Sequence, residues 1–258
     1  MSDTISKRVL VIGATGALGS EVARKFGLEG WRVMLHGFTN ADRLRELRGE
    51  VEEVEDGLTA DITDAEQVAA LYARVAEHWG GELDALAVCT GINPTAALIR
   101  DTDLSLWRKV IDVNLTGPFI VVKGALPLMT SAGGGSIVLI SSIFGTEAPT
   151  NRGAYSAAKH GLTGLVQSVC REEASNGVRI NGVAPGPAWS ANVYRIFTEH
   201  ARTAGMSMEA YVKQRVERIP AGRFVEPSEI GALVVALCDD SMPFVNGQVI
   251  KQTGGAIE

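Results

Sequence analysis

Several features that mark secreted, metal-binding or membrane-spanning proteins are scarce in this sequence. Its only cysteines are Cys89, Cys170 and Cys238, and no CxxC pair occurs. These distant cysteines exclude a disulfide framework and fit a reducing compartment. The histidines show no ligand spacing, so we expect no metal site. No apolar run reaches the ~18 residues that a membrane span needs, and the longest, residues 230–238, contains a glycine.

An excess of positive charge is also absent. The 24 Lys and Arg residues are outnumbered by 30 Asp and Glu, giving a net charge of -6. We therefore expect neither a nucleic acid nor an anionic membrane as the main partner. Charged residues make up 21% and apolar residues 46% of the 258 residues, which excludes a disordered chain and is compatible with one domain. Lys7 and Arg8 before apolar residues 9–12 imitate a short signal peptide, but the glycines that follow favour a buried strand.

Short β-rich runs alternate with helical patterns along the whole chain. Strands are expected at residues 9–12, 32–35, up to 61, 83–88, 136–140, 178–183 and 248–251, and helices at 17–28, 41–47, 64–77, 104–129, 155–174, 190–218 and 228–237. Asp64 is expected to cap its helix, and Pro118 and Pro127 predict a kink or an early end of theirs. The alternation predicts an α/β protein, with a doubly wound parallel sheet covered by helices on both faces.

One segment, about residues 190–223, departs from this alternation. It is polar and helical, is broken by Gly205, carries Tyr194, Phe197 and Tyr211 among charges, and has Trp189 at its entrance. It could be a surface helical pair that packs its aromatic rings into the body, or a lid over a substrate. We favour the lid, because of the motifs that precede it.

A glycine-rich turn lies between the first expected strand and the first helix. Gly13, Gly16 and Gly19 follow the spacing GxxGxxG, which is neither the GxGxxG fingerprint nor a P-loop. Such a turn brings backbone N–H groups and a helix N-terminus to a pyrophosphate. A plain tight turn is the alternative, but the position after the first strand favours dinucleotide binding.

Further motifs lie at the ends of later elements. Tyr155-Ser-Ala-Ala-Lys159 forms a YxxxK pair, and Ser142 precedes the tyrosine by 13 residues. Asn114 stands in Asp-Val-Asn-Leu, and a Pro-Gly pair at 185–186 follows the sixth strand. In this order the motifs resemble the short-chain dehydrogenase/reductase family, over about residues 8–255. Ser156 and Lys159 also spell the SxxK of serine acyl transfer, but no SDN or KTG segment accompanies them.

The resemblance implies a Rossmann-like fold and a catalytic set of Asn114, Ser142, Tyr155 and Lys159. Tyrosine and lysine four residues apart share one helix face. A free tyrosine has a pKa of ~10, and we expect Lys159 to lower it by its charge. Ser142 would hydrogen-bond the substrate oxygen, and Tyr155 would exchange a proton with it. In the family, the asparagine supports a water path to the lysine, and the nicotinamide exchanges hydride with the substrate carbon.

The choice between NAD and NADP depends on the end of the second strand. Residues 36–40 read His-Gly-Phe-Thr-Asn, without the acid that binds a ribose 2′-OH or an arginine for a 2′-phosphate. The nearest cation, Arg43, is expected on the following helix, and the glycine-rich turn carries no Lys or Arg. With no obvious cation for the 2′-phosphate, we favour NAD and keep NADP as the alternative. Asp61 and Ile62 resemble the family pair beside adenine, although Asp61 could be a turn or cap residue. The cofactor contacts implied are Gly13, Thr15, Gly16, Ala17, Leu18, Gly19, Gly37, Phe38, Asp61, Ile62, Thr90, Gly91, Asn114, Tyr155, Lys159, Pro185, Gly186, Ala188 and Ser190.

Parts of the chain look most like the 3-hydroxybutyrate dehydrogenase branch, which holds a small carboxylate. Arg152 resembles its basic residue near the tyrosine and could clamp a carboxylate, or it could be an exposed loop charge. Phe144 and Pro187 stand where that branch has histidine and tryptophan, which argues against the same substrate. Ile92, Glu147 and the lid aromatics are expected around the pocket. The substrate contacts expected are Asn93, Ser142, Phe144, Arg152, Tyr155 and Trp189.

These observations lead us to expect an NAD(P)-linked oxidoreductase that acts on a small secondary alcohol or ketone, including hydroxy or oxo acids. An NADPH-dependent 3-oxoacyl thioester reductase is one alternative. A non-catalytic dinucleotide-binding protein on the same fold is another. The resemblance further implies a cytoplasmic homotetramer that pairs its two long helices.

Overall fold

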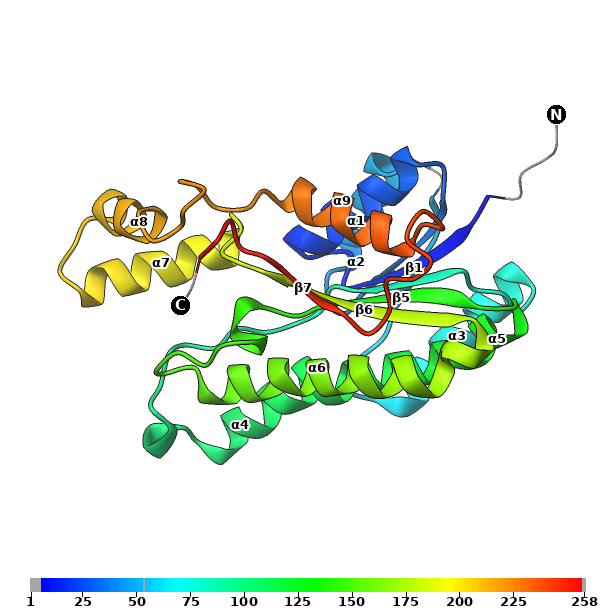
Figure 1. Cartoon of the computed structure of the whole chain (residues 1–258), viewed down its shortest axis with the longest axis horizontal. Helices are drawn as coiled ribbons and strands as arrows, with labels where there is room; N and C mark the ends of the chain where they lie inside the picture. Colours follow the sequence, from blue (N-terminus) through cyan, green and yellow to red (C-terminus); the bar gives the residue numbers. More distant parts are fainter. Residues whose placement is uncertain (1–5, 53, 257–258) are drawn as a thin grey trace.

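Seven parallel strands form the central sheet, in the order β3-β2-β1-β4-β5-β6-β7 (Figure 1). The structure, a computed structural model, describes residues 6–52 and 54–256. The strands are β1 (Arg8–Ile12), β2 (Arg32–Gly37), β3 (Val54–Thr59), β4 (Ala85–Val88), β5 (Gly135–Ile140), β6 (Val178–Pro185) and β7 (Val249–Gln252). The order changes direction between β1 and β4, which is where ligands bind in open sheets of this kind.

Helices cover both faces of the sheet, which confirms the predicted fold class (Figure 1). One layer contains α1 (Ala17–Leu28), α2 (Ala41–Glu50) and α9 (Pro227–Cys238), and the other contains α3 (Ala65–Trp79), α4 (Leu104–Ile111), α5 (Gly117–Ser131) and α6 (Gly153–Glu173). Side chains of β1 alternate between the layers, with Val9 and Val11 in the first core and Leu10 and Ile12 in the second. Strands buried on both faces explain the continuous apolar runs of the sequence.

Local signals place several boundaries where the sequence predicted them. The Asp64 carboxylate accepts the N–H groups of Glu66 and Gln67, which confirms it as the cap of α3. The polar insert forms α7 (Ala191–Thr203) and α8 (Met208–Val216). Gly205, with φ +66°, lies between them, and its left-handed conformation interrupts the segment where the sequence predicted a break. The two helices project beyond the carboxyl end of β6 (Figure 1).

The long helix after β4 neither ends early nor breaks at its prolines. A π-helical turn, Asp112–Thr116, joins α4 to α5. In a regular α-helix the ring of Pro118 would collide with the carbonyl group of residue 114. The π turn is wider than an α-helical turn and includes residue 114, so it leaves room for the proline ring beside that carbonyl. By length and composition, Leu104–Ser131 is apolar enough to cross a membrane, with 39% of its apolar window buried. Because α5 packs on α3 and on the sheet, we interpret it as a packed helix of the fold.

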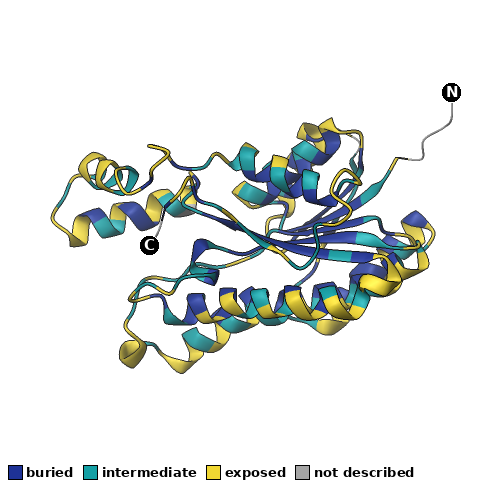
Figure 2. Ribbon diagram, in the orientation of Figure 1, coloured by how far each residue is buried: buried dark blue, intermediate teal, exposed yellow. Residues whose placement is uncertain are grey.

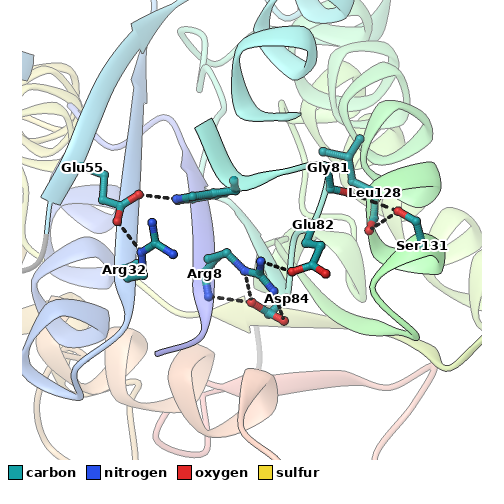
Figure 3. A network of polar contacts seen from close by, with 9 residues as sticks. Arg8, Arg32, Glu55, Gly81, Glu82, Asp84, Leu128 and Ser131 are labelled. Carbon is teal, nitrogen blue, oxygen red and sulfur yellow. Dashed lines mark hydrogen bonds and ion pairs between the residues drawn. The ribbon is translucent and has the colours of Figure 1, made fainter. Parts of the chain in front are cut away.

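A polar network ties the amino ends of the strands together, on the edge opposite the carboxyl ends (Figure 3). Arg8 Nε donates to Asp84 at 2.7 Å and its Nη1 donates to Glu82. Arg32 donates to Glu55, on the neighbouring strand. Figure 2 shows the strands buried and the outer faces of the helices exposed. Polar contacts therefore occupy the amino edge of the sheet, and the carboxyl edge remains available for a functional site.

Candidate active site

A cavity of about 610 Å³ lies at the carboxyl ends of the central strands. The first turn of α1, the segments after β4, β5 and β6, the start of α6 and the helices α7 and α8 all line it. Of the residues expected from the sequence as cofactor or substrate contacts, those that line it are Gly16, Ala17, Leu18, Thr90, Gly91, Asn93, Ser142, Phe144, Arg152, Tyr155, Lys159, Pro185, Gly186, Ala188 and Ser190. The cavity thus joins the glycine-rich turn to the YxxxK pair and to the insert.

The glycine-rich turn presents a bare helix N-terminus to this cavity. Gly13 has φ +79°, and a Cβ on Gly19 would lie 2.2 Å from the carbonyl oxygen of Gly13, so only glycine fits. Gly16 caps α1 without a side chain, which leaves the first N–H groups of the helix free for an anion. The hydroxyl of Thr90 is buried without a hydrogen-bond partner among the described residues. The free N–H groups at the N-terminus of α1 fit the pyrophosphate of a dinucleotide. The unpaired hydroxyl of Thr90 fits a ring of the same cofactor next to the pyrophosphate.

The residues expected around the adenine lie beyond the lining of the cavity. A Cβ on Gly37 would lie 2.8 Å from Thr15 Cγ2, which places the end of β2 against the turn. Phe38 is exposed, and Ile62 is buried in the core. One carboxylate oxygen of Asp61 accepts from the N–H and hydroxyl of Thr63. That oxygen therefore has the turn role that the sequence left as an alternative.

His36, at the same end of β2, is a residue whose role the sequence did not reveal. It is buried and joins two segments that the cofactor would touch. Its Nδ1 lies 3.2 Å from the backbone N of Gly13, and its Nε2 lies 3.0 Å from the carbonyl oxygen of Ala60. Burial lowers the pKa of His36 below its usual 6.5.

Tyr155 and Ser142 meet on the cavity wall. Tyr155 lies on the first turn of α6, and its ring packs edge-on against Phe144 at 6.2 Å. Burial raises the pKa of Tyr155 above 10, while a hydrogen bond from Ser142 and the charge of Arg152 act against this rise. The Ser142 hydroxyl also accepts the N–H of Phe144 at 3.2 Å, which holds it at the end of β5. The tyrosine is therefore a protonated phenol near neutral pH.

Lys159 is buried one helical turn after Tyr155. Its ammonium donates to the carbonyl oxygen of Ile140 at 2.8 Å and lies 5.8 Å from the Tyr155 ring centre. Burial lowers its pKa to about 8. The sequence predicted Lys159 as the cation that lowers the pKa of Tyr155. In the structure the charge of Arg152 lowers the pKa of Tyr155, and the ammonium of Lys159 is hydrogen-bonded to the backbone of β5.

Asn114 lies in the π turn and fastens the segment that follows β4. Its Oδ1 accepts the N–H of Ile92 at 2.8 Å, and its Nδ2 donates to the Ile92 carbonyl at 2.9 Å. A Cβ on Gly91 would lie 2.8 Å from that Oδ1 and 3.5 Å from Lys159 Nζ. Asn114 thus holds Ile92 by both backbone groups and borders the lysine.

At the far end of the cavity the structure modifies the expected substrate wall. Arg152, Asn93, Ile92 and Phe144 line it, as do Phe197 and Tyr211 of the insert. Trp189 does not line it; its ring packs edge-on against Phe197 and Phe224 and is exposed. Glu147 and Tyr194 are also outside the lining: Lys251 donates to Glu147 at 2.9 Å, and Tyr194 is exposed on α7.

Two polar residues of the insert reach the cavity although the sequence did not indicate them. His200 on α7 and Arg215 on α8 line it, and Nε2 of His200 lies 3.3 Å from Nη2 of Arg152. Their only sequence signal is a position on the predicted lid, and which face of each helix turns inward depends on the apolar core formed by Ile196, Phe197 and Ile219. The wall therefore combines apolar rings with cationic and neutral polar groups.

The side chains around the cavity suit an organic ligand. Within the part of the chain that the structure describes, no group of three His, Cys, Asp or Glu side chains could hold a metal ion. The three cysteines are free thiols. Burial raises the pKa of Cys89, on the cavity wall, to about 12, so this thiol is not a ready nucleophile.

Comparison with known proteins agrees with this geometry. Residues 13–256 match the family model described as Enoyl-(Acyl carrier protein) reductase. The D-beta-hydroxybutyrate dehydrogenase of Rhizobium meliloti (strain 1021) is 30% identical over 256 residues, 97% of this chain and 98% of that protein. The cis-4-hydroxycyclohexanecarboxylate dehydrogenase of Sinomonas cyclohexanicum is 32% identical over 257 residues, 99% of this chain and 98% of that protein. A solved variant of the actinorhodin polyketide ketoreductase with NADPH superposes with a TM-score of 0.91 and 32% identity, covering 99% of this chain and 98% of that one. The chain belongs to the short-chain dehydrogenase/reductase family of NAD(P)-dependent oxidoreductases.

Proposed function

We propose that this protein interconverts a small secondary alcohol and the corresponding ketone, with a hydroxy acid and its oxo acid as the substrate class. The observation that carries the proposal is the position of Tyr155. It stands with Ser142 and Lys159 where the cavity passes from the bare N-terminus of α1 to the insert. A cofactor held at the turn and a substrate held below the insert would therefore meet at the phenol.

The residues then divide the reaction between them. The nicotinamide would supply or accept the hydride at the substrate carbon. The phenol of Tyr155 donates its proton to the carbonyl oxygen in reduction, and in oxidation its deprotonated form, the phenolate, takes the alcohol proton. The Ser142 hydroxyl hydrogen-bonds the same oxygen as its charge develops. Lys159, with a pKa of about 8, can release or take up a proton near neutral pH.

The far wall supports a carboxylate on the substrate. Arg152 is 9% exposed and faces the cavity, so the interpretation of a solvent-exposed loop charge is wrong. Arg215 adds a second guanidinium to the same wall. Two relatives are named for hydroxy acids, in agreement with a carboxylate at this end.

A reductase of acyl thioesters with NADPH is the second candidate. The description of the matching family names an acyl carrier protein, and the similar ketoreductase structure holds NADPH. A non-catalytic dinucleotide-binding protein has no support, because the relatives are named dehydrogenases and reductases.

The proposal extends to assembly and location. Residues 190–223 would act as a lid on a single Rossmann-like domain. Leu104 and Phe119, on α4 and α5, and Phe244, before the edge strand β7, are exposed apolar side chains. Such side chains on a long helix and beside a sheet edge support a homotetramer. Free thiols fit the reducing cytoplasm.

The decisive experiment compares Tyr155→Phe with wild type on a panel of hydroxy acids and neutral alcohols, using NAD and NADP. We expect Tyr155→Phe to lose turnover but still to bind NADH, which a fluorescence titration detects. Tyr194→Phe, on the exposed face of α7, is the matched control and should retain activity. Near-normal turnover by Tyr155→Phe would refute the assignment.

A further inference from the structure

A chain of polar contacts along the wall of the cavity connects the body of the protein to the insert. Arg152 Nη1 donates to Asn93 Oδ1 at 3.1 Å and to the carbonyl oxygen of Pro94 at 2.7 Å. Arg152 Nη2 lies 3.3 Å from Nε2 of His200 on α7. The other ring nitrogen of His200 lies 3.0 Å from the hydroxyl of Tyr211 on α8. One imidazole on α7 therefore connects the N-cap of α6 to α8.

The chemistry of Arg152 determines the protonation of this imidazole. A guanidinium has only donors, so Nε2 of His200 must be the acceptor and carry no proton. The ring is then neutral with its proton on Nδ1, which donates to Tyr211. This is the opposite tautomer to that of His36, whose Nδ1 faces the N–H of Gly13.

The surrounding charges act in the same direction. Burial comes first in lowering the pKa of His200, followed by the charges of Arg152, the N-cap of α6, and Arg215 on α8. Glu199, the neighbour on α7, opposes this, but it is 3.7 Å from Arg195. A second cation beside Arg152 is therefore disfavoured, and the neutral ring is the stable form.

We propose that His200 is the positioning residue that fixes the guanidinium of Arg152 for the anionic group of the substrate. The proton on Nδ1 and the bare Nε2 hold the ring between Tyr211 and Arg152, so α7 and α8 keep Arg152 aimed along the cavity. The substrate part of this inference rests on the proposed function, since it needs a carboxylate at that end. The tautomer of His200 and its contact with Arg152 do not depend on the reaction.

Variants separate a positioning role from a structural one. His200→Gln keeps an acceptor for Arg152, whereas His200→Leu removes it at similar size. With 3-hydroxybutyrate and cis-4-hydroxycyclohexanecarboxylate, His200→Leu should raise KM about tenfold, the effect of one lost charge-assisted hydrogen bond. His200→Gln should remain close to wild type. In both variants kcat and the dissociation constant of NADH should stay unchanged, and so should KM for cyclohexanol. His160→Leu, on the exposed face of α6, is the control.

A second measurement does not use turnover. Long-range ¹H–¹⁵N NMR of histidine-labelled protein at pH 7.5, assigned with His200→Gln, should show Nδ1–H and a bare Nε2 for His200. Arg152→Met should abolish that preference and move the pKa of His200 back toward its usual value. An Nε2–H tautomer in wild type, or no change in Arg152→Met, would overturn the proposal. An equal rise of KM in both His200 variants would do the same. If no hydroxy acid is turned over by wild type, the proposed function fails, and the NMR result still decides the role of His200.

Discussion

The N–H of Gly13 donates to Nδ1 of His36, and this bond joins the first turn of the cofactor site to the end of the second strand. The two atoms are 3.2 Å apart, and His36 is 1% exposed. The ring continues through Nε2 to the carbonyl oxygen of Ala60, which precedes Asp61. A neutral imidazole with its proton on Nε2 thus connects the turn to both strands that would surround the adenosine.

Replacing His36 should weaken dinucleotide binding. His36→Leu has a similar volume but leaves the N–H of Gly13 and the carbonyl of Ala60 without partners. Each unpaired backbone group costs about 1–3 kcal/mol if it stays buried, and the turn is expected to rearrange instead. We expect the dissociation constant of NADH, measured by fluorescence titration, to rise about tenfold or more. His160→Leu should bind as wild type does, and an unchanged constant in His36→Leu would show that the turn holds its shape alone.

Cofactor preference should depend on Glu50, a residue outside the cofactor contacts. Asn40 caps α2, and Arg43, the nearest cation to the end of β2, donates to Glu50 and Glu46. The hydrogen bonds from Arg43 and Arg24 lower the pKa of Glu50 to about 2. At neutral pH the carboxylate therefore retains Arg43, whose guanidinium is then not offered to a 2′-phosphate.

We accordingly expect wild type to bind NADH more tightly than NADPH. Glu50→Gln should release Arg43 and lower the dissociation constant of NADPH relative to that of NADH, measured in parallel titrations. Arg43→Gln in the same background should cancel the gain. Tighter NADPH binding by wild type would contradict the expectation and favour the thioester reductase.

Gly91 should not tolerate a methyl group. A Cβ at this position would lie 2.8 Å from Asn114 Oδ1, the atom that accepts the N–H of Ile92. Gly91→Ala would push the amide away and leave that N–H unpaired, so we expect kcat to fall and stability to drop by about 1–3 kcal/mol. Urea unfolding and steady-state kinetics measure both. Gly49→Ala, a helical glycine with open space around it, is the control and should be neutral or stabilising.

The sequence was sufficient wherever a signal is local. Strand alternation predicted the sheet, Asp64 marked the start of α3, and the four-residue spacing placed Tyr155 and Lys159 on one face. The π turn at Asn114 could not be predicted, because it depends on how Pro118 and Ile92 pack around the helix.

The sequence also could not predict contacts between segments that are distant along the chain. His36 meets Gly13 across 23 positions and Ala60 across 24. The insert shows the same limit. Its aromatic residues were visible, but the ring of Trp189 packs on Phe224 outside the lining of the cavity, whereas His200 lines it.

The buried Lys159 should make stability depend on pH in a defined window. Burial lowers its pKa from 10.5 to about 8 in the folded protein. Below pH 8 the ammonium is charged in both states, and the full penalty of burying it is present. Between about pH 8 and 10.5 the unfolded chain holds this proton and the folded protein has released it, so the free energy of unfolding gains from this group as pH rises.

Lys159→Met removes this contribution and isolates it. In dinucleotide-free protein, the difference in unfolding free energy between the variant and wild type should favour the variant at pH 7 and shrink by about 3 kcal/mol up to pH 10.5. Urea titrations across this range measure the difference. Cys89 and Cys238, whose pKa values burial raises to about 12, act in the opposite direction at high pH. Cys238 is present in both proteins and its contribution cancels, whereas the charge of Lys159 lowers the pKa of Cys89, so the comparison is made with Cys89→Ser in both proteins. A difference that does not change with pH would mean that Lys159 stays charged in the folded state, and that the carbonyl of Ile140 stabilises the ammonium more than burial disfavours it.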